Sequence, residues 1–165
     1  MILGNLMCKI VNLEIGCPSS TPKACKRKLG ERLKKYEYDD SFIDNLNDDM
    51  VIGYYVAKEI VKDIASDYIH AAFDSLKENE DDRAKEIGVV RDVMCEMIAL
   101  ETSSFFSLEK TQKQLKKILE KHEWDNSFIN GVNSDITAGY NLGIDVFMEM
   151  IGNYLNVLEE NRKKV

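Results

Sequence analysis

The sequence of 165 residues predicts an all-α protein, a helical bundle formed by internal duplication. Residues 35–61 recur as residues 121–147, and 10 of the 27 aligned positions are identical. Apolar residues in both copies recur every three or four positions, which is the period of an amphipathic helix. Only two prolines and nine glycines occur, which argues against a turn-rich β protein. We expect two helix–short turn–long helix units, at about 21–78 and 107–163, joined by a linking helix.

Residues 1–20 are predicted to form an N-terminal arm outside a helical domain at 21–165. Residues 11–15 alternate apolar and polar side chains, as a β-strand does. Such a strand could pair with a second copy or with another protein. The interpretation that we favour is an extended arm lying on the helices.

The first unit begins at Thr21, a good N-cap residue, followed by Pro22 in the first helical turn. Its apolar stripe consists of Cys25, Leu29, Leu33 and Tyr36. A short helical turn capped by Asp39 follows. Asn47 then caps a long helix over about 48–77, whose core face is Ile60, Val61, Ile64, Tyr68 and Ala72.

The second unit repeats this order. Ser107 caps a helix whose apolar stripe consists of Leu108, Leu115, Ile118, Leu119 and His122. Asp125 caps the short turn, and Asn133 caps a long helix over about 134–162. The core face of this helix is Ile144, Phe147, Ile151, Tyr154 and Leu158.

Small residues four positions apart predict where the two long helices cross. Gly53 and Ala57 share one helix face in the first copy, and Gly139 and Gly143 share it in the second. Glycine inside a helix costs up to about 1 kcal/mol, so a close approach of two backbones is the expected reason for it.

The linking helix is expected over about 82–102 and has no second copy in this scheme. Its predicted core residues are Ile87, Val90, Met94, Met97 and Ile98. The pattern of the chain is therefore helix, short turn, long helix, linking helix, helix, short turn, long helix.

Net charge and hydropathy narrow the function classes. The net charge of −7 argues against binding nucleic acid with the whole surface. No apolar run reaches the roughly 18 residues needed to cross a bilayer, and the N-terminus lacks a basic leader. We expect a cytoplasmic protein with no membrane partner.

Four cysteines, Cys8, Cys17, Cys25 and Cys95, form no C-x-x-C pair. We expect buried, reduced thiols, as Cys95 in an apolar helical stretch suggests. A metal or redox cluster of the first three cysteines is the alternative.

No residue is predicted to be catalytic, to bind a metal or to hold a cofactor. The acidic loops around Asp39 and Asp125 could offer oxygen ligands to calcium, but Ile43 and Ile129 occupy an EF-hand ligand position. Helix capping explains the same aspartates. Asp67-x-x-His70 only distantly resembles a di-metal bundle motif.

Lysine and arginine are concentrated in the first helix of each unit. We single out Lys28 and Arg32 in the first copy, and Lys113 and Lys117 in the second. Placed side by side, these helices would form one positive surface for phosphates or an acidic protein. A solvated lysine-rich face is the alternative.

Aromatic residues at the connectors are candidate partner contacts. They are Tyr36, Tyr38, Tyr55 and Trp124. Tyrosine and tryptophan are common anchors at protein interfaces. Tyr38 and Trp124 share one repeat position, so a structural plug that closes each connector is the alternative.

These features favour a noncatalytic protein-binding module, such as a small acidic adaptor, inhibitor or immunity-type protein. One alternative is a nucleic-acid-associated regulator that uses the lysine-rich helices. Another is a metal-binding or enzymatic bundle. A protein partner is expected, and nucleic acid and a homodimer are kept as alternatives.

Overall fold

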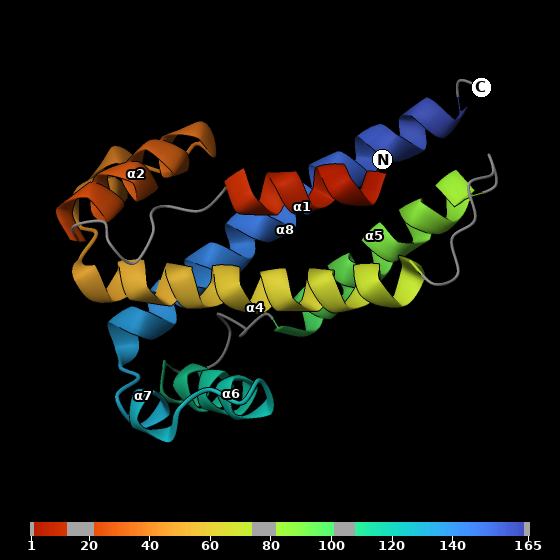
Figure 1. Ribbon diagram of the computed structural model, residues 1–165. Coiled ribbons are helices and arrows are strands. Elements are labelled where there is room, and N and C mark those ends of the chain that lie inside the picture. Colours follow the sequence, from red (N-terminus) through yellow and green to blue (C-terminus); the bar gives the residue numbers. More distant parts are fainter. Residues whose placement is uncertain (1, 13–21, 74–81, 101–107, 164–165) are drawn as a thin grey trace.

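The computed structural model describes residues 2–12, 22–73, 82–100 and 108–163, and within these ranges every regular element is a helix, with short turns between some of them and no strand (Figure 1). The all-α prediction is confirmed. The helices are α1 (Ile2–Asn12), α2 (Pro22–Lys35), α3 (Asp40–Asp44), α4 (Asp48–Phe73), α5 (Asp82–Leu100), α6 (Leu108–Lys121), α7 (Asn126–Asn130) and α8 (Ser134–Lys163). Within the described ranges, none of these helices is both long and apolar enough to span a bilayer.

The long helices α4 and α8 pack against each other through the small residues that the sequence singled out. A Cβ atom added to Gly143 would lie 2.6 Å from the Cβ of Ala57. One added to Gly53 would lie 2.6 Å from the backbone nitrogen of Tyr140. These distances leave no room for larger residues, so the predicted crossing is confirmed.

Helices α1 and α5 complete the central part of the bundle, because each contacts both long helices and they contact each other. The strand or extended arm predicted for the N-terminus is wrong over the residues described. Leu3, Leu6 and Ile10 recur at helical spacing and are buried in the core. Burial of these three side chains outweighs the short alternating pattern that began at Val11. Residues 13–15 lie outside the described ranges.

Tyr154 of α8 fastens α1 to the bundle. Its hydroxyl donates a hydrogen bond to the backbone oxygen of Ile2 at 3.0 Å. The ammonium group of Lys9 lies 5.2 Å from the centre of the same ring, within the range of a cation–π contact. The N-terminal helix is therefore held by polar contacts as well as by its apolar face.

Helices α2 and α6 end with the same backbone geometry. Glu37 and Glu123 have φ values of 62° and 60°, in the left-handed region. The N–H of Tyr38 donates to the oxygen of Leu33 at 3.1 Å, and the N–H of Trp124 donates to the oxygen of Leu119 at 3.0 Å. Together with the bonds from Glu37 to Lys34 and from Glu123 to Glu120, these contacts form a Schellman motif. Glutamate stands where glycine is usual.

The caps predicted at Asp39, Asp125, Asn47 and Asn133 are confirmed, whereas Thr21 and Ser107 lie outside the described residues. Asp39 and Asp125 each accept hydrogen bonds from the backbone N–H and the hydroxyl of the serine two residues later. Asn47 accepts the N–H of Met50 at 2.9 Å, and Asn133 accepts the N–H of Ile136 at 2.8 Å. These bonds satisfy backbone donors that the helices leave free at their N-termini.

The predicted core faces are largely buried, with Ile98 as a clear exception. Its side chain is 52% exposed, although the sequence placed it in the core. The buried hydrophobic positions described in α5 are Ile87, Val90, Val93, Met97 and Leu100. Ile98 follows Met97 by one residue and therefore points about 100° away from the buried face.

Candidate functional site

A solvent-open hollow of about 410 Å³ lies between the end of α1 and α2. The described residues that line it are Asn12, Lys28, Glu31, Arg32 and Lys35. Its charged lining residues are three cations and one anion, so the hollow is a basic site on an acidic chain. Two of the predicted partner-binding residues, Lys28 and Arg32, come together in it.

The helical spacing of α2 creates this arrangement. Lys28, Arg32 and Lys35 are four and three residues apart, so they share one face of the helix. Leu29 and Leu33 are fully buried on a neighbouring face and orient α2 on the bundle. As a result, Lys28 and Lys35 are exposed and Arg32 is partly buried.

The positive charge of Arg32, a residue that lines the hollow, affects the pKa values of two tyrosines. Burial raises the pKa of Tyr36 and of the fully buried Tyr54 above the ordinary value, and the positive charge of Arg32 lowers both values in part. Glu149 of α8 acts in the opposite sense and raises the pKa of Tyr36 further. The positive charge of Arg32 therefore favours the ionised forms of the tyrosine that follows α2 and of the core tyrosine of α4.

Tyr38 and Trp124 occupy matching positions after α2 and α6. The Tyr38 and Phe42 ring centres are 5.8 Å apart, and the Trp124 and Phe128 ring centres are 5.2 Å apart. Each aromatic residue therefore contacts the short helix that follows and helps to close its connector. Both side chains keep a partly exposed surface, and their role as partner contacts stays a prediction.

Tyr55 belongs to a polar group on α4 that the sequence did not reveal. Lys58 is only 2% exposed, and its ammonium group lies 2.9 Å from a carboxylate oxygen of Glu59. The same ammonium group is 5.2 Å from the Tyr55 ring centre. Burial acts to raise the pKa of Glu59, but the hydrogen bond from Lys58 and the charges of Lys58 and Lys62 outweigh it and lower that pKa.

The burial of Lys58 has one signal in the sequence. Offset by 86 positions, Lys58 aligns with Ile144, a buried core residue of α8. A lysine aligned with a core isoleucine could have been singled out as a buried charge.

The two lysine-rich helices do not lie side by side, so that expectation is wrong. Helix α2 packs on α4 and α3, whereas α6 packs on α8 and α7. Figure 1 shows them on opposite sides of the long helices. Lys113 and Lys117 are exposed on α6, far from the basic hollow, because α2 packs on α4 whereas α6 packs on α8.

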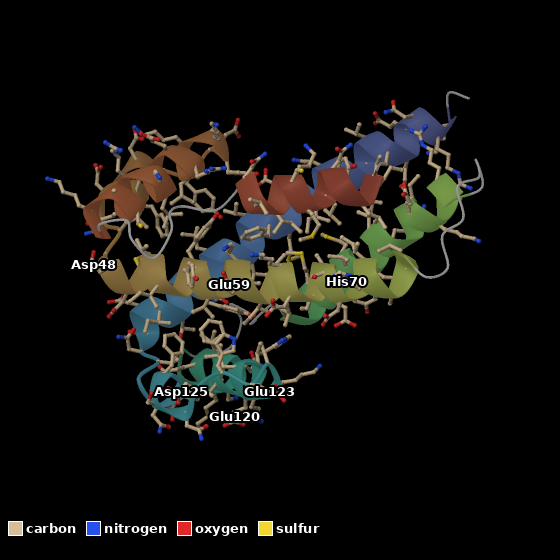
Figure 2. All side chains as sticks on the ribbon, viewed as in Figure 1. Asp48, Glu59, His70, Glu120, Glu123 and Asp125 are labelled. Carbon is tan, nitrogen blue, oxygen red and sulfur yellow. The ribbon has the colours of Figure 1, made fainter. Side chains whose placement is uncertain are left out.

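The acidic residues and histidines are dispersed. Figure 2 shows Glu120, Glu123 and Asp125 at the α6–α7 corner and His70 on α4, away from that corner. Asp67 and His70 are both exposed. Across the described ranges, no group of three histidine, cysteine, aspartate or glutamate side chains is placed to hold a metal ion.

The cysteines differ from the prediction. Cys8 and Cys95 are exposed, Cys25 is partly buried, and all three are free thiols. Cys95 is exposed because it falls between the buried positions Val93 and Met97 of α5. Cys17 lies outside the described residues, which leaves the proposed three-cysteine cluster untested.

Comparison with known proteins gives no relative. No family model, no curated protein and no solved structure matches the chain.

Proposed function

We propose that the protein is a noncatalytic protein-binding module, and that α2 and the basic hollow form its partner-binding surface. The observation that carries this proposal is the hollow itself, where Lys28, Arg32 and Lys35 line one open space at the end of α1. A cleft lined mainly by charges of one sign concentrates the electrostatic field and attracts partners of the opposite charge. An acidic partner surface is the complement of this lining.

The uneven distribution of charge supports the proposal. Helix α2 carries seven cations and one anion, a net charge of +6 in a chain with a net charge of −7. Among these cations, Lys26 forms an ion pair with Asp48 at 3.1 Å. The seven cations of this single helix speed the encounter with an acidic partner and exclude basic ones.

We also infer that the chain arose by duplication of a four-helix unit, α1–α4 and α5–α8. In support, α1 precedes α2 as α5 precedes α6, and α1 contacts both long helices as α5 does. The unit proposed here is larger than the one that the sequence suggested, because it gives the linking helix a counterpart in α1.

The proposed duplication supports the assignment of the binding surface to the first copy. At the positions that correspond to Lys28 and Arg32, the second copy has Gln114 and Ile118. The three-cation face is therefore specific to the first copy, whereas the caps and the crossing glycines occur in both. Features shared by both copies serve the fold, and the difference between the copies falls on the proposed surface.

A cytoplasmic location is part of the proposal. The free thiols of Cys8, Cys25 and Cys95 support it, because reduced cysteines are typical of a reducing compartment.

The experiment is native mass spectrometry of the tagged protein captured gently from its own cells. Wild type is compared with Lys28→Glu/Lys35→Glu in the hollow and with Lys113→Glu/Lys117→Glu on α6, which makes the same change of charge. We expect a protein partner at fixed stoichiometry with wild type and the α6 variant, and its loss with the hollow variant. A bare monomer or homodimer, or equal capture by all three proteins, would contradict the proposal.

A further inference from the structure

The spacing of the cations that line the hollow indicates which shape of partner would match them. Lys28, Arg32 and Lys35 follow one another by four and three residues on a single face of α2. At a rise of 1.5 Å per residue, the outer two lie about 10 Å apart along the helix axis. Carboxylates at positions i, i+4 and i+7 of a second helix have the same spacing and also share one face.

We propose that the hollow binds an acidic helix of the partner protein, whose carboxylates at i, i+4 and i+7 meet Lys28, Arg32 and Lys35. This inference rests on the proposed function and specifies the chemistry of the partner at the same surface. The partner helix lies along α2, over the end of α1, where Asn12 belongs to the lining.

Arg32 occupies the middle of the site. Arg32 is partly buried, and an arginine, unlike a lysine, can bind one carboxylate through two parallel hydrogen bonds. Lys28 and Lys35 are exposed at the two ends, where a charge adds attraction but is screened by solvent and salt. We therefore expect Arg32 to supply geometric specificity and the two lysines to supply steering.

Glu31 favours a helix with spaced carboxylates over a nucleic acid. Glu31 belongs to the lining of the hollow together with the cations. A nucleic-acid strand carries a phosphate on every nucleotide, so a strand that follows the cations would also bring negative charge toward Glu31. A partner helix can instead place an uncharged side chain between carboxylates that are one helical turn apart.

The test uses two labelled peptides of about 20 residues, long enough to form helix, with identical composition. One carries glutamates at i, i+4 and i+7 on a single face, and the other spreads the same glutamates around the helix. Fluorescence anisotropy measures the binding of each peptide to the full chain. We expect the single-face peptide to bind at least about tenfold more tightly.

Variants locate the site. We expect Lys28→Glu/Lys35→Glu to weaken binding of the single-face peptide by about tenfold or more, and Lys113→Glu/Lys117→Glu to leave it unchanged. Arg32→Lys keeps the charge but loses the planar pair of donors, so we expect a several-fold loss for the single-face peptide only. Circular dichroism and thermal melting establish that each variant is folded.

Three outcomes would overturn the inference. Equal binding of the two peptides would show general charge attraction without helical spacing. Displacement of the single-face peptide by a short DNA duplex at equal concentration would indicate a nucleic-acid site. Absence of peptide binding would refute the acidic helix, while partner capture that is lost in Lys28→Glu/Lys35→Glu would still support the proposed function.

Discussion

Gly53 and Gly139 make reciprocal contacts where α4 crosses α8. A Cβ atom on Gly53 would lie 2.0 Å from the backbone oxygen of Ile136, one turn before Gly139. A Cβ atom on Gly139 would lie 1.9 Å from the backbone oxygen of Met50, one turn before Gly53. Because each glycine lacks a side chain, the backbone of the other helix can occupy the space where a Cβ atom would lie. A backbone oxygen cannot move aside as a flexible side chain can.

Gly139→Ala should therefore destabilise the protein by about 3 kcal/mol, because the new methyl group forces α4 and α8 apart. Urea unfolding followed by circular dichroism measures the free energy of unfolding. Gly88→Ala in α5 is the matched control, because no atom lies within 4 Å of an added Cβ there. We expect that control to gain about 0.5–1 kcal/mol from helix propensity. Equal effects of the two substitutions would contradict the close crossing.

Glu123→Gly should stabilise the protein by up to about 1 kcal/mol. The left-handed conformation of Glu123, with a φ of 60°, strains a residue with a Cβ, and glycine adopts it freely. The same unfolding measurement applies, with Glu120→Gly as the control. Glu120 lies in the last turn of α6, where glycine costs up to about 1 kcal/mol. A loss of stability in both variants would refute the assigned backbone geometry.

Asp125→Asn should lower the melting temperature near neutral pH and have progressively less effect in acid. The hydroxyl and the backbone N–H of Ser127 donate to the Asp125 carboxylate and lower its pKa below the usual 3.8. A lowered pKa in the folded state stabilises the protein above the unfolded value, and this contribution disappears as pH falls through the folded value. Melting curves of wild type and variant over a pH series test this. A difference that widens toward acid would have the wrong sign.

Replacing Glu59 alone should destabilise the protein more than replacing Lys58 alone. Glu59→Gln removes the charge of the carboxylate that lies 2.9 Å from the buried Lys58 ammonium group, which should cost about 1–3 kcal/mol, since Glu59 is 27% exposed and partly screened. Lys58→Met keeps the volume and removes the buried charge, so stability should change by less than about 1 kcal/mol.

The double variant Lys58→Met/Glu59→Gln completes a thermodynamic cycle measured by urea unfolding. We expect it to be more stable than Glu59→Gln alone. Additive effects of the two substitutions would show that the pair is not coupled.

Several structural features were predictable because the signals for them are local. Asp39, Asp125, Asn47 and Asn133 cap their helices through bonds that span only two or three residues. The left-handed residues were not predictable, because Glu37 and Glu123 stand where the rule expects glycine. The alternating residues that begin at Val11 favour a strand, but Leu3, Leu6 and Ile10 recur at helical spacing and their burial decides that residues 2–12 form a helix.

The sequence by itself determined the helices, their caps and the small residues at the crossing, since each depends on spacings within one or two helical turns. Only the tertiary structure decided that α2 and α6 lie on opposite sides of α4 and α8, and that α1 ends beside Lys28 and Arg32 to form a hollow. Helical periodicity indicates which face of a helix is apolar, but not which helix will cover it. The choice of neighbour depends on packing between residues far apart in the chain, and that packing created the proposed binding surface.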